Sequence, residues 1–135
     1  YTSLAQFSSA ATDEVSIRMT ELPKLVFSST LREPLAWENT RLVKGSLADE
    51  IRKLKRKTGA PLRCIGSISL VKSMIQLGLV DRLRLMIFPL ILGTAGKEPI
   101  FAAYRRTGLR LLGSRVLDSR LILLEYRQAH SRKSV

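Results

Sequence analysis

The spacing of hydrophobic residues near the N-terminus predicts a first amphipathic helix. Val15, Met19 and Leu22 recur at intervals of four and three residues, which is typical of one face of a helix. Thr12 is expected to cap this helix, and Pro23 to end it. The residues before Thr12 are small, polar and too weakly patterned to predict an element.

A second amphipathic helix is predicted to begin after Ser46. Leu47, Ile51 and Leu54 form its apolar stripe, and lysines and arginines fill most of the other positions. Asp49 stands three residues after Ser46, as a carboxylate variant of the capping box.

Short apolar runs predict six strands. One of them, Leu62–Ile65, is expected to be buried and to lead into a helix from Ser67 to about Leu77, which Gly78 ends. The other predicted strands are Lys24–Ser28, Arg41–Val43, Arg82–Phe88, Leu109–Gly113 and Arg120–Arg127. The last two are expected to form an antiparallel hairpin.

This order of elements predicts an α/β fold in one domain, residues 1–135, with a polar basic tail over residues 128–135. Strands that alternate with helices favour a mostly parallel sheet, to which the C-terminal hairpin adds antiparallel strands at one edge. Ligands of such sheets bind at the carboxyl ends of the strands. Two of these ends carry suitable residues, at Ser28–Thr30 and at Gly66-Ser67.

The turn at Gly66 is suited to a phosphate. Gly66 permits a tight turn and a close approach of a ligand, and the first N–H groups of the next helix, at about Ser67 to Leu70, have no partner within that helix. The alternative is that Gly66 only makes the turn and Ser67 only caps the helix.

Two further segments allow two interpretations each. Ser28, Ser29 and Thr30 offer three hydroxyls beside Arg32, a set that suits an adenosine 2′-phosphate, or they form a solvated turn bonded to its own backbone. The loop Leu90–Lys97 is either the rim of a cleft or an ordinary surface loop.

The charge balance points to anionic partners. The chain has 23 Lys and Arg against 11 Asp and Glu, a formal net charge of +12, which attracts phosphates on a small cofactor or on nucleic acid. Aromatic residues, which stack on bases, make up only 6% of the chain. We therefore expect any contact with nucleic acid to be non-specific.

The sequence offers no self-contained catalytic centre. His130 is the only histidine and stands in the polar tail, so a histidine triad or metal site is not expected, and no catalytic residue is predicted. Cys64 is expected to pack inertly in its strand, and Asp81 and Asp118 to act as caps. One cysteine, no visible signal peptide and no membrane span predict a cytoplasmic protein.

Several segments together resemble the dihydrofolate reductase-like proteins related to the riboflavin biosynthesis reductase, the C-terminal domain of the bacterial deaminase-reductase. The resemblance runs from Asp13 to Arg127, and it implies a three-layer α/β sandwich, NADPH as hydride donor, a small-molecule substrate and a homodimer. The segments that carry it are Lys24–Leu31, Ile65–Leu70, Gly78–Leu85, Phe88–Gly93, Leu112–Ser119 and Leu121–Arg127.

The same resemblance implies which residues bind the cofactor and substrate. The adenosine-phosphate end matches Ser28, Ser29 and Thr30, the pyrophosphate turn matches Ile65, Gly66, Ser67, Ile68, Ser69 and Leu70, and the rim near the nicotinamide and substrate matches Leu92 and Gly93.

Three departures from the family pattern narrow the function. Tyr1 resembles the tail of a Gly-Arg-x-Thr-Tyr motif that follows a first strand, so we expect a fragment or a reduced copy of the domain. Cys64 stands where the riboflavin-pathway reductases carry a substrate-binding carboxylate, which disfavours their substrate. The single Gly66-Ser67 differs from the paired glycines of true dihydrofolate reductases.

The leading hypothesis is an NADPH-dependent reductase of a heterocyclic or carbonyl-like compound. One alternative is the riboflavin-pathway reductase itself. Another is a non-catalytic relative that binds RNA or a larger assembly through a basic surface made of Ser46–Lys57, Arg105, Arg106, Arg110 and the Arg132-Lys133 tail.

Overall fold

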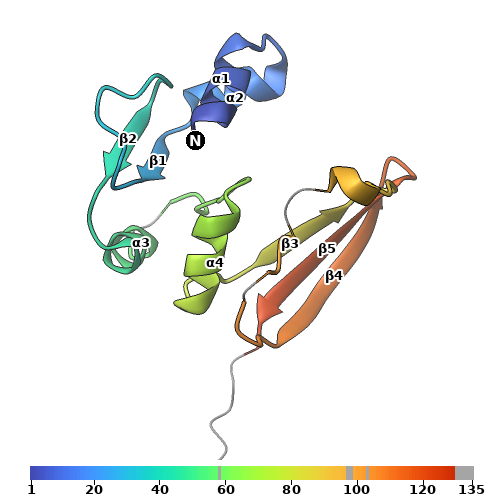
Figure 1. Ribbon diagram of the computed structural model, residues 1–135. Coiled ribbons are helices and arrows are strands. Elements are labelled where there is room, and N and C mark those ends of the chain that lie inside the picture. Colours follow the sequence, from blue (N-terminus) through green and yellow to red (C-terminus); the bar gives the residue numbers. More distant parts are fainter. Residues whose placement is uncertain (58, 97–98, 103, 130–135) are drawn as a thin grey trace, which may run out of the picture. The chain divides into compact units, whose positions relative to one another are not determined.

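The structure, a computed structural model, describes residues 1–57, 59–96, 99–102 and 104–129. The chain divides into two compact units, unit 1 over Tyr1–Lys57 and unit 2 over Thr58–Val135 (Figure 1). Each unit is described by itself, and the single domain stays a prediction. Lys97, His130 and the Arg132-Lys133 tail lie outside the described residues.

Unit 1 combines three helices with a parallel pair of strands. Strands β1 and β2 pair in parallel from Lys24 opposite Thr40 to Phe27 opposite Val43, which confirms both predicted strands. Its elements are α1 (Thr2–Ala10), α2 (Glu14–Glu21), β1 (Lys24–Phe27), β2 (Thr40–Val43) and α3 (Leu47–Lys55).

Helix α3 follows its prediction closely. Ser46 caps it by accepting a hydrogen bond from the backbone N–H of Asp49 at 3.4 Å. Ile51 is buried, and Leu47 and Leu54 are half-buried, so the predicted apolar stripe is the inward face.

The first two helices differ from the prediction. Helix α1 was not expected, and the cap of α2 is Asp13 rather than Thr12, since the Asp13 carboxylate accepts from the Ser16 N–H at 3.1 Å. The predicted face of α2 is wrong because Val15 is 68% exposed. Leu22 is also exposed, and the buried positions of this helix pair are the small residues Ala5, Ser8 and Ser16. Small side chains let two helices approach closely, and a search for large apolar residues misses them.

Trp37 joins the helices of unit 1 to its strands. It is 4% exposed, its indole N–H donates to the Thr20 hydroxyl at 2.9 Å, and its backbone N–H donates to the Tyr1 hydroxyl at 3.1 Å. The Lys24 ammonium lies 4.7 Å from the ring centroid and donates to three carbonyls at the end of α2. The indole and this ammonium together hold β1 and the loop before β2 against α2.

We expect Thr20→Val to destabilise unit 1 by about 1–2 kcal/mol, because the nearly isosteric side chain leaves the buried indole N–H of Trp37 without its acceptor. Urea unfolding followed by tryptophan fluorescence measures this loss. Thr40→Val is the matched control, since the Thr40 hydroxyl bonds an exposed carbonyl. Equal stability of the two variants would contradict the prediction.

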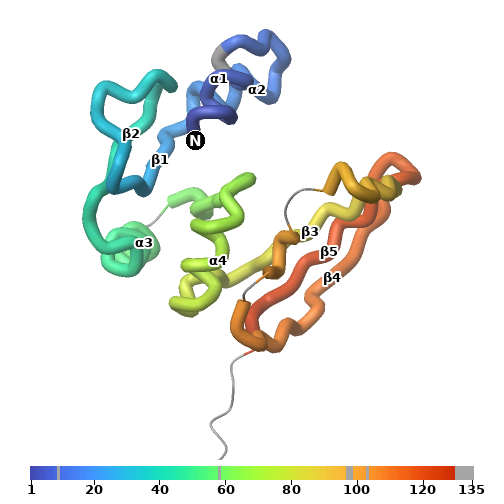
Figure 2. Tube along the Cα trace, in the orientation of Figure 1, coloured from blue at the N-terminus to red at the C-terminus, as the bar shows by residue number. Residues whose placement is uncertain are grey.

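Unit 2 is built around an antiparallel sheet in the order β3-β5-β4 (Figures 1 and 2). The predicted strand at residues 62–65 is wrong: this stretch belongs to no strand among the described residues, and Cys64 is exposed rather than buried. An apolar run forms a strand only where a neighbouring strand takes up its hydrogen bonds. The elements are α4 (Ile68–Gln76), β3 (Leu83–Ile87), the 3-10 turn η1 (Gly93–Ala95), β4 (Leu109–Leu117) and β5 (Leu121–Gln128).

The C-terminal hairpin is confirmed and is longer than predicted. Strand β4 continues to Leu117 through a bulge between Leu111 and Gly113, and β5 lies between β3 and β4. The expected mostly parallel sheet is therefore observed only in part: the described residues form one parallel pair and one antiparallel three-stranded sheet.

Helix α4 ends as its sequence predicts. Gly78 has φ +66° and donates to the Ile75 carbonyl at 3.1 Å, while Leu79 donates to the Met74 carbonyl at 2.9 Å. These two bonds form a Schellman motif, and Leu79 and Met74 are both buried beside it. No helix among the described residues is long and apolar enough to cross a membrane.

Glu125 holds two strands of unit 2 together through its charge. Its carboxylate contacts the guanidinium groups of Arg82 at 2.5 Å and Arg84 at 3.2 Å. The hydrogen bond from Arg82, with the charge of Arg84, lowers the pKa of Glu125 below its usual value of 4.5. A pKa that folding lowers contributes stability above the unfolded value, and this contribution is lost as the pH falls through the folded value.

We therefore expect Glu125→Gln to destabilise unit 2 at neutral pH and to reduce the further loss of stability below about pH 4.5. Urea unfolding at a series of pH values, followed by circular dichroism, measures both effects. Glu14→Gln, which removes the same charge from the exposed start of α2, is the control. A variant whose acid-side loss equals that of the unchanged protein would contradict the role of Glu125.

Candidate functional site

The N-terminus of α4 presents free backbone donors after a left-handed turn. Gly66 has φ +75°, which confirms the predicted tight turn. Ser67 stands at the cap position without a side-chain hydrogen bond to the helix, and the first helical bond runs from the Val71 N–H to the Ser67 carbonyl at 2.9 Å. The N–H groups of Ile68–Leu70 therefore have no carbonyl partner within the helix.

The charge at this helix start favours an anion. No acidic residue lies in the first turn of α4, so the positive end of the helix dipole is not neutralised there by a side chain of its own turn. The alternative in which the Ser67 side chain caps the helix is not observed. The site can take an oxygen-rich anion such as a phosphate.

Cys64 faces this turn as a neutral thiol. Although the residue is exposed, nearby atoms partly desolvate its sulfur, which raises the pKa of the Cys64 thiol above its usual value of 9.0, and a hydrogen bond from the Ser67 backbone opposes that rise only in part. The thiol is therefore protonated at neutral pH, and it brings no negative charge to the start of α4.

Gly66→Ala is expected to destabilise unit 2 by about 1–2 kcal/mol, because a Cβ is strained at φ +75° even though nothing lies within 4 Å of it. Thermal unfolding measures the loss. Gly113→Ala is the matched control, since Gly113 also has open space around its Cβ and no positive φ. The backbone argument fails if both variants melt together.

The hydroxyl group of Ser28 forms hydrogen bonds with the backbone of the turn that follows it. Its oxygen accepts hydrogen bonds from the backbone N–H groups of Thr30 at 3.2 Å and Leu31 at 3.1 Å. This is the local bonding that the alternative interpretation describes. Ser29 and Arg32 are exposed beside it, as is Thr30.

Lys44, which was not identified from the sequence as a candidate site residue, lines a cleft together with Arg32. Phe27 and Val43 are register partners in the parallel pair β1–β2, so the residues that follow each of them lie at the same edge. Arg32, Glu33, Leu42 and Lys44 line a cleft of about 560 Å³ there. The parallel pairing of the two predicted strands was the signal that could have identified Lys44.

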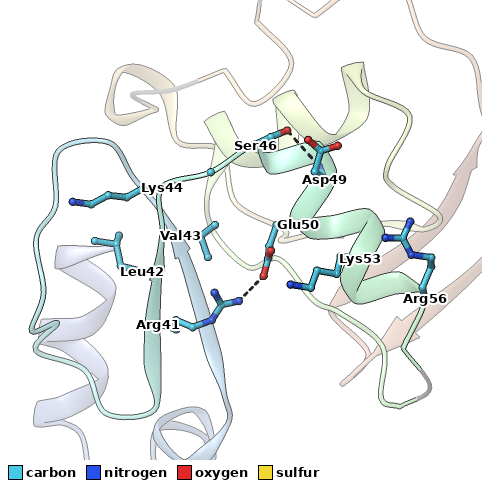
Figure 3. A pocket seen from close by; sticks show the side chains of 10 residues that line it. Arg41, Leu42, Val43, Lys44, Ser46, Asp49, Glu50, Lys53 and Arg56 are labelled. Carbon is cyan, nitrogen blue, oxygen red and sulfur yellow. Dashed lines mark hydrogen bonds and ion pairs between the residues drawn. The ribbon is translucent and has the colours of Figure 1, made fainter.

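A second cleft of about 470 Å³ lies on the other face of β2, toward α3 (Figure 3). Alternation along β2 turns Arg41 and Val43 toward α3, and Leu42 and Lys44 away from it (Figure 3). Arg41 donates to Glu50 at 2.5 Å, and this bond lowers the pKa of the Glu50 carboxyl. The cleft thus contains its own ion pair.

Leu92 and Gly93 lie at the start of η1 in unit 2. Gly93 has φ +52°, and Leu92 is 58% exposed, next to the almost fully exposed Ile91. The predicted site residues therefore fall into two groups, with Ser28–Thr30 in unit 1 and the segments around Gly66 and Gly93 in unit 2. No cluster of three metal-ligating side chains occurs among the described residues.

The family model of the RibD C-terminal domain matches residues 4–123. The chain belongs to this family. A curated relative, the uncharacterized protein YyaP of Bacillus subtilis (strain 168), is 33% identical over 104 residues. That match covers 76% of this chain and 53% of YyaP, so the chain spans about half the length of the curated relative it matches.

Two solved structures share the fold. A "putative riboflavin biosynthesis protein" from Shewanella sp. PV-4 is 24% identical with a TM-score of 0.68, over 86% of this chain and 71% of its own. A pyrimidine reductase-like protein from Corynebacterium diphtheriae is 18% identical with a TM-score of 0.52, over 78% of this chain and 49% of its own. A mixed α/β fold of this reductase-like type is thereby confirmed.

Proposed function

We propose that this RibD-family chain is a reductase that transfers a hydride from NADPH to a small heterocyclic or carbonyl-like compound. The observation that carries the proposal is the start of α4, where backbone donors without helical partners follow the left-handed Gly66. Family membership supports it, and the nicotinamide, when bound, supplies the hydride chemistry.

The start of α4 would hold the cofactor pyrophosphate. The N–H groups of Ile68, Ser69 and Leu70 would donate to its oxygens, and the positive helix end favours its charge. Gly66 permits a close approach because it has no side chain, and Ile65 and Ser67 complete the turn.

The turn Ser28–Thr30, which the family resemblance matches to the adenosine-phosphate end, would bind a 2′-phosphate. Ser29 and Thr30 supply exposed hydroxyls, and Arg32 and Lys44, which line a cleft together with Glu33 and Leu42, supply two positive charges against one negative charge. Ser28, whose hydroxyl already bonds Thr30 and Leu31, would shape the turn rather than bind the phosphate.

The substrate would differ from that of the riboflavin-pathway reductases. The neutral thiol of Cys64 stands where the riboflavin-pathway reductases resembled by this chain carry a carboxylate, so the hydrogen-bond acceptor with a negative charge is missing. Leu92 and Gly93 would form an apolar rim of the substrate site.

We propose further that the protein is a cytoplasmic homodimer with the three-layer sandwich that the family resemblance implies.

We expect Arg32→Gln/Lys44→Gln to weaken NADPH binding by about tenfold or more and to leave NADH binding nearly unchanged, because only NADPH carries the 2′-phosphate. Isothermal titration with both nucleotides measures this difference. Arg18→Gln/Arg52→Gln is the matched control, since it removes two positive charges from exposed arginines of the same unit that pair with Glu21 and Asp49.

Two outcomes would overturn the proposal. A folded protein without affinity for NADPH would exclude the cofactor, and steep salt-dependent RNA binding in such a protein would favour the non-catalytic alternative. Binding of NADPH without its oxidation in the presence of flavin precursors, pyrimidines or carbonyl compounds would exclude these substrate classes.

A further inference from the structure

One face of the antiparallel sheet in unit 2 collects arginines. Residues that stand opposite each other in neighbouring strands share a face, as do alternate residues of one strand. Arg84 stands opposite Glu125, Arg110 opposite Arg127, and Arg115 opposite Leu123. We call the surface formed by Arg82, Arg84, Arg110, Arg115 and Arg127 the arginine face.

The carboxylate on the arginine face neutralises only part of the positive charge there. Glu125 is the carboxylate that the register places on it, and that carboxylate is already bonded to Arg82 and Arg84. Arg110, Arg115 and Arg127 are all exposed. The ion pair of Glu125 therefore leaves most of the charge of this face available to a ligand.

The register also places two like charges directly opposite each other. Arg110 pairs with Arg127 across β4 and β5, an arrangement that destabilises a sheet, whereas Arg84 opposite Glu125 stabilises it. An anion that bridges the two guanidinium groups would turn this repulsion into attraction. The pair of Arg110 and Arg127 therefore does not stabilise the sheet in the absence of a ligand.

The charge of the whole unit reinforces the local pattern. Residues 58–135 contain thirteen Lys and Arg against four Asp and Glu, a formal net charge of +9, whereas residues 1–57 carry only +3. A field of this sign attracts polyanions over several ångströms and speeds their association.

The chemistry of the face favours a nucleic acid over an acidic protein. Protein interfaces rely on buried aromatic and apolar anchors, and Tyr126, the aromatic residue of β5, points to the opposite face of the sheet. Arginine forks suit phosphate oxygens, and a nucleic acid presents many phosphates in succession, so several of these arginines could each bind one. The three strands themselves place no aromatic residue on the arginine face, so binding would depend on the phosphates more than on the bases.

We infer that the arginine face binds the phosphate backbone of nucleic acid independently of sequence. This surface differs from the start of α4 and from the cleft at Lys44, so the inference does not depend on the proposed reductase activity. Either a single strand or a duplex offers this phosphate chemistry.

The test is fluorescence anisotropy of a labelled uridine 20-mer and of a labelled 20-base-pair duplex, titrated with the full chain at several salt concentrations. The variant is Arg127→Glu, and the matched control is Arg56→Glu at the C-cap of α3, which changes the net charge by the same amount in the other unit. Thermal unfolding of each variant is measured alongside.

We expect Arg127→Glu to weaken binding by about tenfold or more and to reduce the slope of log affinity against log salt by about one to two. Arg56→Glu should change affinity less than about threefold. Since the new carboxylate faces Arg110, Arg127→Glu should melt at an equal or higher temperature, which separates lost binding from lost fold.

Three results would overturn the inference. The first is an absence of binding to both oligonucleotides at low salt. The second is an equal loss for Arg56→Glu and Arg127→Glu, which would mean that net charge alone attracts the ligand. The third is tighter binding of a poly-glutamate peptide than of either oligonucleotide, which would reassign the face to an acidic protein.

Discussion

The pairing of β5 with two neighbours at once is the constraint on which unit 2 depends. Because β5 bonds β3 on one side and β4 on the other, one register determines which residues of all three strands share a face. That register brings Glu125 to Arg84 and Arg127 to Arg110. A slip of one residue would place these charged side chains among the leucines of the opposite face, so the hydrophobic alternation and the charge pattern support the same alignment.

The phosphate site proposed at the start of α4 would depend on backbone atoms more than on side chains. Gly66 contributes a torsion angle, Ser67 contributes no side-chain bond to the helix, and the donors are peptide N–H groups. Few side chains identify such a site, so it is difficult to predict from a sequence. This explains why physical reasoning alone kept two interpretations of the turn open, and why the order of segments along the chain was needed to connect it with a RibD-type reductase.

Much of the fold followed from local patterns. The strands β1 and β2, the cap of α3 by Ser46, the left-handed residues Gly66 and Gly78 and the C-terminal hairpin were all predictable, because each depends on residues close together in sequence. The elements that were predicted wrongly or not at all depend on other factors. Helix α1 buries small residues rather than large ones, and whether residues 62–65 form a strand depends on a partner far away in the chain.

The candidate site was predictable to a similar extent. Ser28 and Gly66 were identified from their position after apolar runs, whereas Lys44 emerged only once the parallel register of β1 and β2 was known. The arginine face could not be predicted from the sequence for the same reason. Arg110 and Arg127 are 17 positions apart in the sequence, and only strand pairing places them opposite each other.

The burial of Trp37 has a spectroscopic consequence. It is the only tryptophan of the chain, and it lies in unit 1 against the Lys24 ammonium. Its emission therefore reports on one unit alone, while circular dichroism reports on both. Comparing the two signals during denaturation would reveal whether the halves of this molecule melt as one cooperative body or in succession.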